Sequence, residues 1–263
     1  MRLGRIASPD GVAFVAIEGD RTAVAREIAE HPFGTPTFTG RQWPLADVRL
    51  LAPILATKVV CVGKNYAAHV AEMAADARTK TVPDDPVIFM KPNTAIVGPN
   101  AQIVLPADAN PVHYEGELAA VIGRPCKDVS AARAAENILG YTIANDVTAR
   151  DQQRKDGQWT RAKGYDTFCP VGPWIATDLD PADLEIRTKV NGELRQHSRT
   201  SMMVHDIGAI VEWISSVMTL LPGDLILTGT PEGVGPIEDG DVVSVTIEGI
   251  GTLTNPVVRK AKS

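Results

Sequence analysis

Residues 113–123 read HYEGELAAVIG, and their pattern is that of a strand buried on both faces. Alternate residues of a strand face the same side, so the apolar run after Glu117 leaves neither face polar. Glu115 and Glu117 then share one face of the strand. Two carboxylates beside a core are costly unless a cation neutralises them. The stretch therefore predicts either two exposed acids where the strand enters solvent, or a buried acidic site.

Short apolar runs bounded by Pro, Gly or Asn recur around this stretch and predict further strands. A cleanly alternating run at 184–190 meets Asn191-Gly192, the strongest short signal for a hairpin. Helical periodicity is best at 207–218, and a second helix is expected at 131–138. Many short strands with few helices predict an α+β, mainly β fold and disfavour a doubly wound sheet. The other expected strands are 59–62, 87–90, 102–105, 141–144, 225–227, 243–247 and 252–258.

The start of the chain predicts a small separate unit. Residues 1–18 have the pattern of a hairpin, with a turn at the Ser-Pro-Asp-Gly sequence of residues 8–11. A short helix is expected at 22–30, and a stretch rich in Pro and Gly follows it. This organisation predicts an N-terminal domain at residues 1–55 and a main body at residues 56–263.

The composition bounds the function. The chain has 263 residues, 44% hydrophobic and 22% charged, which is ordinary for a soluble globular protein. Its net charge of -6 argues against nucleic-acid binding, which needs a clustered basic face. No apolar run approaches the roughly 20 residues that span a bilayer, and no signal-peptide core follows the N-terminus. The 3 cysteines form no C-x-x-C pair, which favours a reducing cytosol over a disulfide framework or a thiolate zinc site.

Asp146 is a third carboxylate at the end of a strand-like segment. It could cap a helix that begins at residues 148–153. If it instead converges with Glu115 and Glu117, the three oxygen ligands suit a hard cation, Mg²⁺ or Mn²⁺. Such a site leaves about three octahedral positions for water and substrate. The distance along the chain from Glu117 to Asp146 does not establish that they meet.

Two more segments carry candidate catalytic groups. On a helix, His69 and Glu72 share a face, and a carboxylate that orients an imidazole raises its basicity, as a general base requires. They could equally be a surface pair, and the polar stretch 74–85 after them is either a plain loop or an active-site lid. Lys163 lies in an aromatic-rich loop, where it either stabilises an enolate oxygen or lies on the surface.

Several common site types are excluded. Residues 228–235 read TGTPEGVG, but no helix follows them, so they are not a phosphate-binding loop. The motifs G-x-S-x-G and H-E-x-x-H are absent from the sequence. Cys61 has no base at a spacing that would make it a nucleophile, and buried cysteine is usually inert.

Taken in order, these segments resemble the fumarylacetoacetate hydrolase superfamily, from about residue 58 to residue 257. Each segment alone is weakly specific, whereas seven in the same order are strongly so. They are 65–69 (NYAAH), 91–92 (KP), 114–118 (YEGEL), 145–151 (NDVTARD), Lys163, 221–224 (LPGD) and 228–235 (TGTPEGVG).

The resemblance implies a body built around a β-roll, with the site at one mouth, and a homodimer. Glu115, Glu117 and Asp146 match the family's Mg²⁺ or Mn²⁺ ligands. The short N-terminal region resembles that of bacterial members described as hydroxyheptadienedioate isomerases or acylpyruvate hydrolases.

The resemblance also implies roles around the metal. Lys163 and Gln153 match residues that orient the substrate, and Thr230 matches a contact to the substrate carboxylate. His69 with Glu72 matches the lid dyad of acylpyruvate hydrolases and oxaloacetate decarboxylases.

The implied function is that of a cytosolic, metal-dependent enzyme acting on a small 2-oxo or enol dicarboxylic acid. A 2-hydroxyhepta-2,4-diene-1,7-dioate isomerase-type activity in aromatic-acid catabolism is expected first. Carbon–carbon hydrolysis of acylpyruvates and decarboxylation of oxaloacetate stay open, since one such site supports all three outcomes. A non-catalytic homologue that binds metal or ligand would have lost a metal ligand or the dyad, and this chain keeps both.

Overall fold

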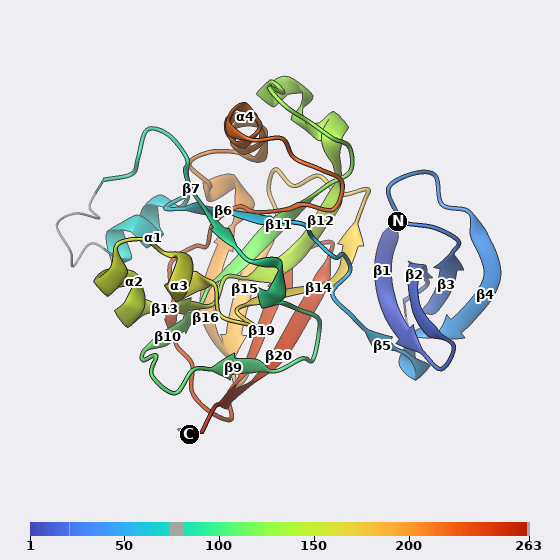
Figure 1. The fold of residues 1–263 in the computed structure, drawn as a ribbon, viewed down its shortest axis with the longest axis horizontal. Helices are drawn as coiled ribbons and strands as arrows, with labels where there is room; N and C mark the ends of the chain where they lie inside the picture. The colour runs from blue at the N-terminus through green and yellow to red at the C-terminus, as the bar shows by residue number, and fades with distance from the viewer. Residues whose placement is uncertain (21, 74–80, 262–263) are drawn as a thin grey trace.

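The structure, a computed structural model, describes residues 1–20, 22–73 and 81–261 (Figure 1). Its α-helices are α1 (Ala67–Glu72), α2 (Arg150–Asp156), α3 (Thr160–Lys163) and α4 (Ile207–Val217), and its 3₁₀ helices are η1 (Leu45–Asp47), η3 (Asn93–Ala95), η4 (Ala131–Asn137) and η5 (Thr200–Met202). Its strands are β1 (Arg2–Ser8), β2 (Gly11–Glu18), β3 (Val24–Ile28), β4 (Phe38–Pro44), β5 (Arg49–Leu50), β6 (Val59–Gly63), β7 (Val87–Lys91), β8 (Ile96–Val97), β9 (Ile103–Leu105), β10 (Val112–Tyr114), β11 (Gly116–Ile122), β12 (Ile138–Asn145), β13 (Thr148–Ala149), β14 (Cys169–Ala176), β15 (Glu185–Val190), β16 (Glu193–Arg199), β17 (Leu225–Leu227), β18 (Gly235–Pro236), β19 (Val242–Ile247) and β20 (Gly251–Arg259). The fold is mainly β, as predicted.

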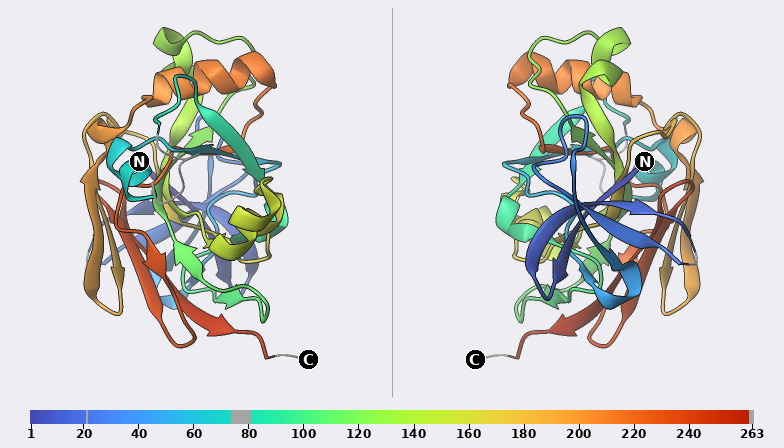
Figure 2. Two further views of the ribbon diagram at one scale, coloured as in Figure 1. Left: turned by 90° about the vertical axis from the view of Figure 1, so that its left-hand side faces the viewer. Right: turned by 90° about the vertical axis from the view of Figure 1, so that its right-hand side faces the viewer.

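One large sheet runs through the molecule. Its strand order is β4-β3-β2-β1-β14-β12-β11-β17-β6-β7, with β5 paired to β1 and β8 paired to β14. A second sheet, β16-β15-β19-β20-β9, forms a layer beside β11 and β12, seen from the side in Figure 2. A small sheet, β13-β10-β18, lies next to the end of β11. None of the helices among the described residues is long and apolar enough to cross a membrane.

β11 lies between two hydrophobic cores, which explains its unbroken apolar sequence. Leu118, Ala120 and Ile122 face the core shared with the second sheet. Ala119 and Val121 face the other core, which is shared with β6 and β17. All seven residues of the strand are buried. The prediction of a strand buried on both faces is confirmed; Glu117 lies near the start of β11, Glu115 directly precedes the strand, and both are buried rather than exposed to solvent.

The N-terminal strands β1 to β4 form a lobe at one side of the molecule (Figure 1). The predicted hairpin is confirmed, because β1 and β2 pair along their whole length. The predicted helix at 22–30 is wrong: this segment is β3, paired with β2 and β4. A segment this short gains little from helix formation alone, so pairing on both sides decides its structure.

The other predicted helices and the predicted hairpin have different outcomes. α4 is confirmed, with Asp206 as N-cap accepting a hydrogen bond from the Ala209 N–H. The segment at 131–138 is a 3₁₀ helix rather than an α-helix, and Ile138 already begins β12. Asn191 and Gly192 both have positive φ, at 52° and 83°, and join β15 to β16 in the predicted hairpin.

Candidate active site

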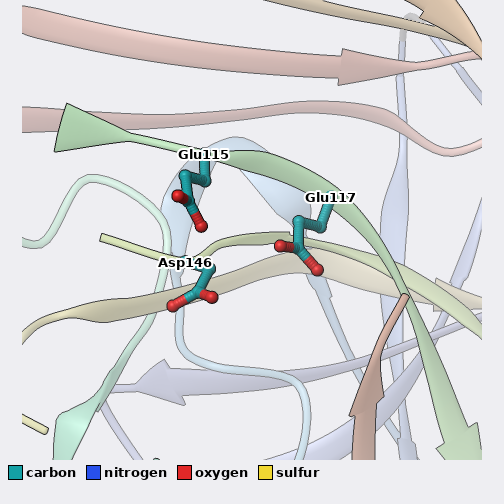
Figure 3. Close-up of side chains that lie close together, drawn as sticks. All are labelled: Glu115, Glu117 and Asp146. Atoms are coloured by element: carbon teal, nitrogen blue, oxygen red, sulfur yellow. The ribbon is translucent and has the colours of Figure 1, made fainter. Parts of the chain in front are cut away.

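The pairing of β11 with β12 brings the three carboxylates together. Gly116 lies opposite Asn145 in this antiparallel pair, so Glu115 lies opposite Asp146. The Asp146 N–H donates to the Glu115 carbonyl oxygen at 2.8 Å. One carboxylate oxygen from each of Glu115, Glu117 and Asp146 lies within 4.8 Å of the others (Figure 3). Asp146 is not a helix cap, because α2 begins at Arg150.

Gly116 separates the two glutamates for a steric reason. A Cβ at this position would lie 2.3 Å from Thr188 Oγ1 and 2.9 Å from Val245 Cγ1, both in the second sheet. Its N–H donates at 3.0 Å to the side-chain oxygen of Gln196, which is also fully buried. The two sheets therefore approach each other closely directly behind the carboxylates, and a side chain here would push them apart.

Two cations lie against the carboxylates. Lys163 Nζ donates to Glu115 at 2.7 Å and to Asp146 at 2.6 Å, and Arg150 donates to Glu115. All four groups are buried. Lys163 ends the short helix α3 rather than lying in the expected loop. Buried charges are stable only when paired in this way, so these ion pairs tie α2 and α3 to β11 and β12.

Lys91 is a third buried cation at the site. Its Nζ lies 2.8 Å from Asp146 Oδ1, but its three hydrogens are directed at the carbonyl oxygens of Val147, Lys163 and Phe168, at 3.1, 2.6 and 2.8 Å. Asp146 Oδ1 consequently accepts no hydrogen bond from the described residues. It is a buried carboxylate oxygen with room for another partner.

The three cations divide the carboxylates into unlike environments. Burial alone would raise the pKa of Glu115, but the charges of Arg150 and Lys163 outweigh it and hold that pKa well below its ordinary value. Glu117 lacks such a partner, and burial together with the charges of Asp146 and Glu115 raises its pKa well above the ordinary 4.5. Its Oε2 accepts a hydrogen bond from the Gly229 N–H at 2.7 Å. A further positive charge beside Glu117 would relieve this repulsion.

These features fit a divalent metal ion. The ligand set consists of carboxylate oxygens, which is the choice of Mg²⁺ and Mn²⁺ rather than of softer metals. Asp146 Oδ1 has no hydrogen-bond donor among the described residues, and burial together with neighbouring negative charge raises the pKa of Glu117. The group could therefore hold a metal through Glu115, Glu117 and Asp146.

The predicted His69–Glu72 pair is present on α1. His69 Nδ1 lies 3.3 Å from Glu72 Oε2, and the imidazole is largely buried. Glu72 also accepts the Gly233 N–H at about 3.0 Å. Burial opposes ionisation of Glu72, but its hydrogen bonds with His69 and Gly233 outweigh this and lower its pKa. The pair is thus fixed to the 228–235 loop, and the charge of His69 acts on Glu115. Of the proposed lid at 74–85, residues 74–80 lie outside the described residues.

The other two predicted residues lie around the same site. Gln153 accepts a hydrogen bond from Arg150 at 2.9 Å, so it reaches the carboxylates through that arginine. Thr230 Oγ1 donates to the Gly116 carbonyl oxygen at 2.9 Å and accepts from Gln196 at 2.8 Å, which fixes the 228–235 loop behind the acidic group. The structure gathers every predicted site residue at one end of β11.

Sequence reasoning missed the roles of Lys91, Arg150 and His113. Lys91 ends an apolar strand, which is an unusual place for an ammonium group; this position and its place in the 91–92 family segment were its signals. His113 precedes Glu115 in β10, and burial followed by the charge of Arg150 lowers its pKa to about 4. Its imidazole is therefore neutral at neutral pH, and its buried Nδ1 lacks a partner among the described residues.

Fold and site define a mainly β protein with a buried acidic group that can hold a cation and is flanked by lysine and arginine. Residues 58–258 match the family model described as fumarylacetoacetate (FAA) hydrolase C-terminal, and residues 1–53 match the model described as Rv2993c-like, N-terminal. The chain belongs to the fumarylacetoacetate hydrolase superfamily.

Individual relatives agree with this assignment. Protein Rv2993c of Mycobacterium tuberculosis is 76% identical over 269 residues and 100% of both chains. A crystal structure named 2-hydroxyhepta-2,4-diene-1,7-dioate isomerase, from Mycobacterium marinum, is 76% identical over 100% of both chains with a TM-score of 0.92. A Bos taurus protein named oxaloacetate tautomerase FAHD2B, mitochondrial, is 44% identical over 82% of this chain and 71% of its own.

Proposed function

We propose that this protein is a divalent-metal-dependent enzyme acting on a small 2-oxo or enol dicarboxylic acid, with a 2-hydroxyhepta-2,4-diene-1,7-dioate isomerase-type activity in aromatic-acid catabolism. The observation that carries the proposal is the contact of Lys163 Nζ with both Glu115 and Asp146 inside the buried acidic group. The name of the Mycobacterium marinum relative supports this choice of substrate.

The residues of the chain have distinct roles in this proposal. A bound Mg²⁺ or Mn²⁺ would supply Lewis-acid polarisation of a 2-oxo carboxylate. Lys163, as a buried ammonium, offsets negative charge on an enolate oxygen. His69 takes the proton of the 2-hydroxyl group and delivers it to a carbon farther along the diene, which turns the dienol into a 2-oxo-ene, and Glu72 holds its imidazole in position. Arg150 holds Glu115 and Gln153, which keeps both groups in place for the substrate.

A second candidate is tautomerisation of oxaloacetate. It requires His69 to move a proton between the enol oxygen and the adjoining carbon, and it breaks no carbon–carbon bond. The name of the Bos taurus relative favours it over hydrolysis and decarboxylation, and the His69–Glu72 contact supplies the base that it needs. Both candidates fit a cytosolic enzyme, since Cys61, Cys126 and Cys169 are all free and buried.

A substrate panel tests the proposal. The purified protein, with Mg²⁺ or Mn²⁺, is given a 2-hydroxydiene-1,7-dioate, oxaloacetate and an acylpyruvate. We expect the diene chromophore to shift without release of CO₂ or a cleaved acid, and chelator treatment to abolish the change. Cleaved product would replace isomerisation by hydrolysis or decarboxylation. Lack of turnover of every substrate by metal-loaded protein would show a non-catalytic homologue.

A further inference from the structure

Helix α2 carries two arginines one turn apart. The side chain of Arg150 is buried and contacts Glu115. Its backbone N–H donates to the carbonyl oxygen of Pro111, just before β10, at 2.9 Å. Arg154 follows four residues later, so it lies on the same face of the helix, one turn farther from the acidic group. It makes no ion pair or hydrogen bond with any described residue. An exposed arginine on this face is therefore available to a ligand.

His113 lies beside this face of α2. It is opposite Thr148 in the β10–β13 pair, directly before the residues that enter α2. The charges that act on its imidazole come from Arg150, Glu115 and Arg154 and from Glu72 on α1. The ring therefore lies near the start of α2, and its buried Nδ1 has no partner among the described residues.

The net charge of the buried carboxylates, their cations and a bound metal ion determines how much negative charge a ligand must bring. Metal binding requires all three carboxylates to be ionised, and their charge then balances that of Lys91, Arg150 and Lys163, which contact Glu115 and Asp146. A divalent cation would leave two positive charges in a buried place, where uncompensated charge is costly. One carboxylate of a ligand removes half of this excess. A second negative charge on the same ligand removes the rest.

We infer that Arg154, together with His113, forms a subsite for the distal carboxylate of a dicarboxylic substrate. This inference rests on the proposed function and adds the residue that distinguishes a diacid from a monoacid. The first carboxylate and the 2-oxo group lie at the acidic group, and the second carboxylate lies one helical turn outward. Arg154 binds it with its planar, two-pronged guanidinium group, and His113 contributes a ring N–H.

Equilibrium binding of two stable probes tests the inference without turnover. 2-Oxoadipate and 2-oxohexanoate have the same chain length and the same 2-oxo carboxylate, and differ in the distal carboxylate. Isothermal titration of each into Mn²⁺-loaded protein gives the affinity advantage of the diacid. We expect this advantage to be about tenfold or more in the wild type, the size of one charge-assisted contact. Arg154→Gln abolishes it, and Arg154→Lys keeps part of it.

Lys155→Gln is the matched control, because it removes one exposed positive charge from the adjacent position on a different face of α2. It keeps the full diacid advantage, whereas a general effect of net charge would reduce it as much as Arg154→Gln does. Equal affinities for both probes in the wild type, or an undiminished advantage in Arg154→Gln, would overturn the subsite while leaving the substrate panel unaffected. Failure of both probes to bind metal-loaded protein would overturn the subsite and the proposed function together.

Discussion

Glu117 is the carboxylate whose removal tests the metal site most cleanly. It lacks a cationic partner, and its pKa is raised, so a neutral amide suits its surroundings in the metal-free protein. We expect Glu117→Gln to remain folded, with a midpoint of thermal unfolding at least as high as that of metal-free wild type. It should lose the Mn²⁺-induced stabilisation that a ligand specific for the native state must produce. Thermal unfolding with and without Mn²⁺ measures both effects.

Glu115→Ala is the informative contrast. It leaves Arg150 and Lys163 buried without their partner, so we expect it to lower the free energy of unfolding by about 3–5 kcal/mol. Urea unfolding measures this loss.

Unchanged Mn²⁺ binding in the Glu117→Gln variant would remove the three-carboxylate metal site from consideration.

His69 is predicted to transfer the proton. His69→Ala should lower the turnover rate by about a hundredfold or more, the usual contribution of a general base, while Mn²⁺ affinity is retained. Glu72→Gln should give a milder defect, because it keeps an acceptor for Gly233 but weakens the orientation of the imidazole. Steady-state kinetics with titration of Mn²⁺ separates the two properties.

His197→Ala is the control for this pair. His197 also contacts a glutamate, Glu185 at 2.7 Å, but it is exposed on the β15–β16 hairpin. It should have wild-type kinetics. Wild-type rates in His69→Ala on every accepted substrate would show that the α1 pair has no catalytic role.

Among the elements, the close approach of the two sheets at Gly116 makes this position sensitive to substitution. A Cβ in Gly116→Ala meets Thr188 and Val245 at distances that no relaxed structure tolerates. We expect the free energy of unfolding to fall by about 1–3 kcal/mol, and Mn²⁺ affinity to fall with it, since the glutamates on either side must move. Gly34→Ala, where a Cβ meets nothing within 4 Å, should change neither. Equal effects of the two substitutions would contradict this account.

The β3–β4 hairpin contains a pH-dependent ion pair. Thr39 donates to Glu27, and Arg41 contacts both oxygens of this buried carboxylate; together they lower its pKa below the ordinary 4.5 against the opposing effect of burial. A lowered native pKa stabilises the fold above pH 4.5, and this stabilisation disappears as the pH falls through the native pKa. Glu27→Gln should therefore cost about 1 kcal/mol at pH 7 and progressively less below pH 4.5. Urea unfolding at several pH values measures the difference, and a constant difference would contradict it.

The elements also show what the sequence could predict. Strands β11 and β15 were predictable from their sequences. Burial on both faces gives β11 a continuous apolar run, and burial on one face gives β15 an alternating pattern. The strand structure of the segment at 22–30 was not predictable, because its pairing with β2 and β4 decides it. The residues of the segment do not themselves show this pairing. The meeting of Asp146 with Glu115 is a property of strand register, which a sequence spacing does not contain. The contact of Arg150 with Glu115 could not be predicted for the same reason, because the two residues are far apart in the sequence.

For the whole molecule, the N-terminal lobe continues the main sheet, because Arg2 and Leu3 of β1 pair with Ala176 and Ile175 of β14. We predict a homodimer, as the family resemblance implies. Light scattering at micromolar concentration should give twice the 28.1 kDa mass of the chain. A monomer at that concentration would rule the dimer out.

Lys91 has a consequence for how this chain can change over time. Its ammonium group serves three backbone carbonyls, in the turn after β12, at the end of α3 and just before β14. Backbone carbonyls are the same in every amino acid, so changing the residues that carry them does not remove the need for a donor here. Arginine would present a planar fork instead of three diverging hydrogens, and a neutral residue would remove the donor that the three carbonyls share. Many side chains around the site can therefore change during evolution, whereas loss of Lys91 would disrupt the arrangement of the three backbone segments that it joins.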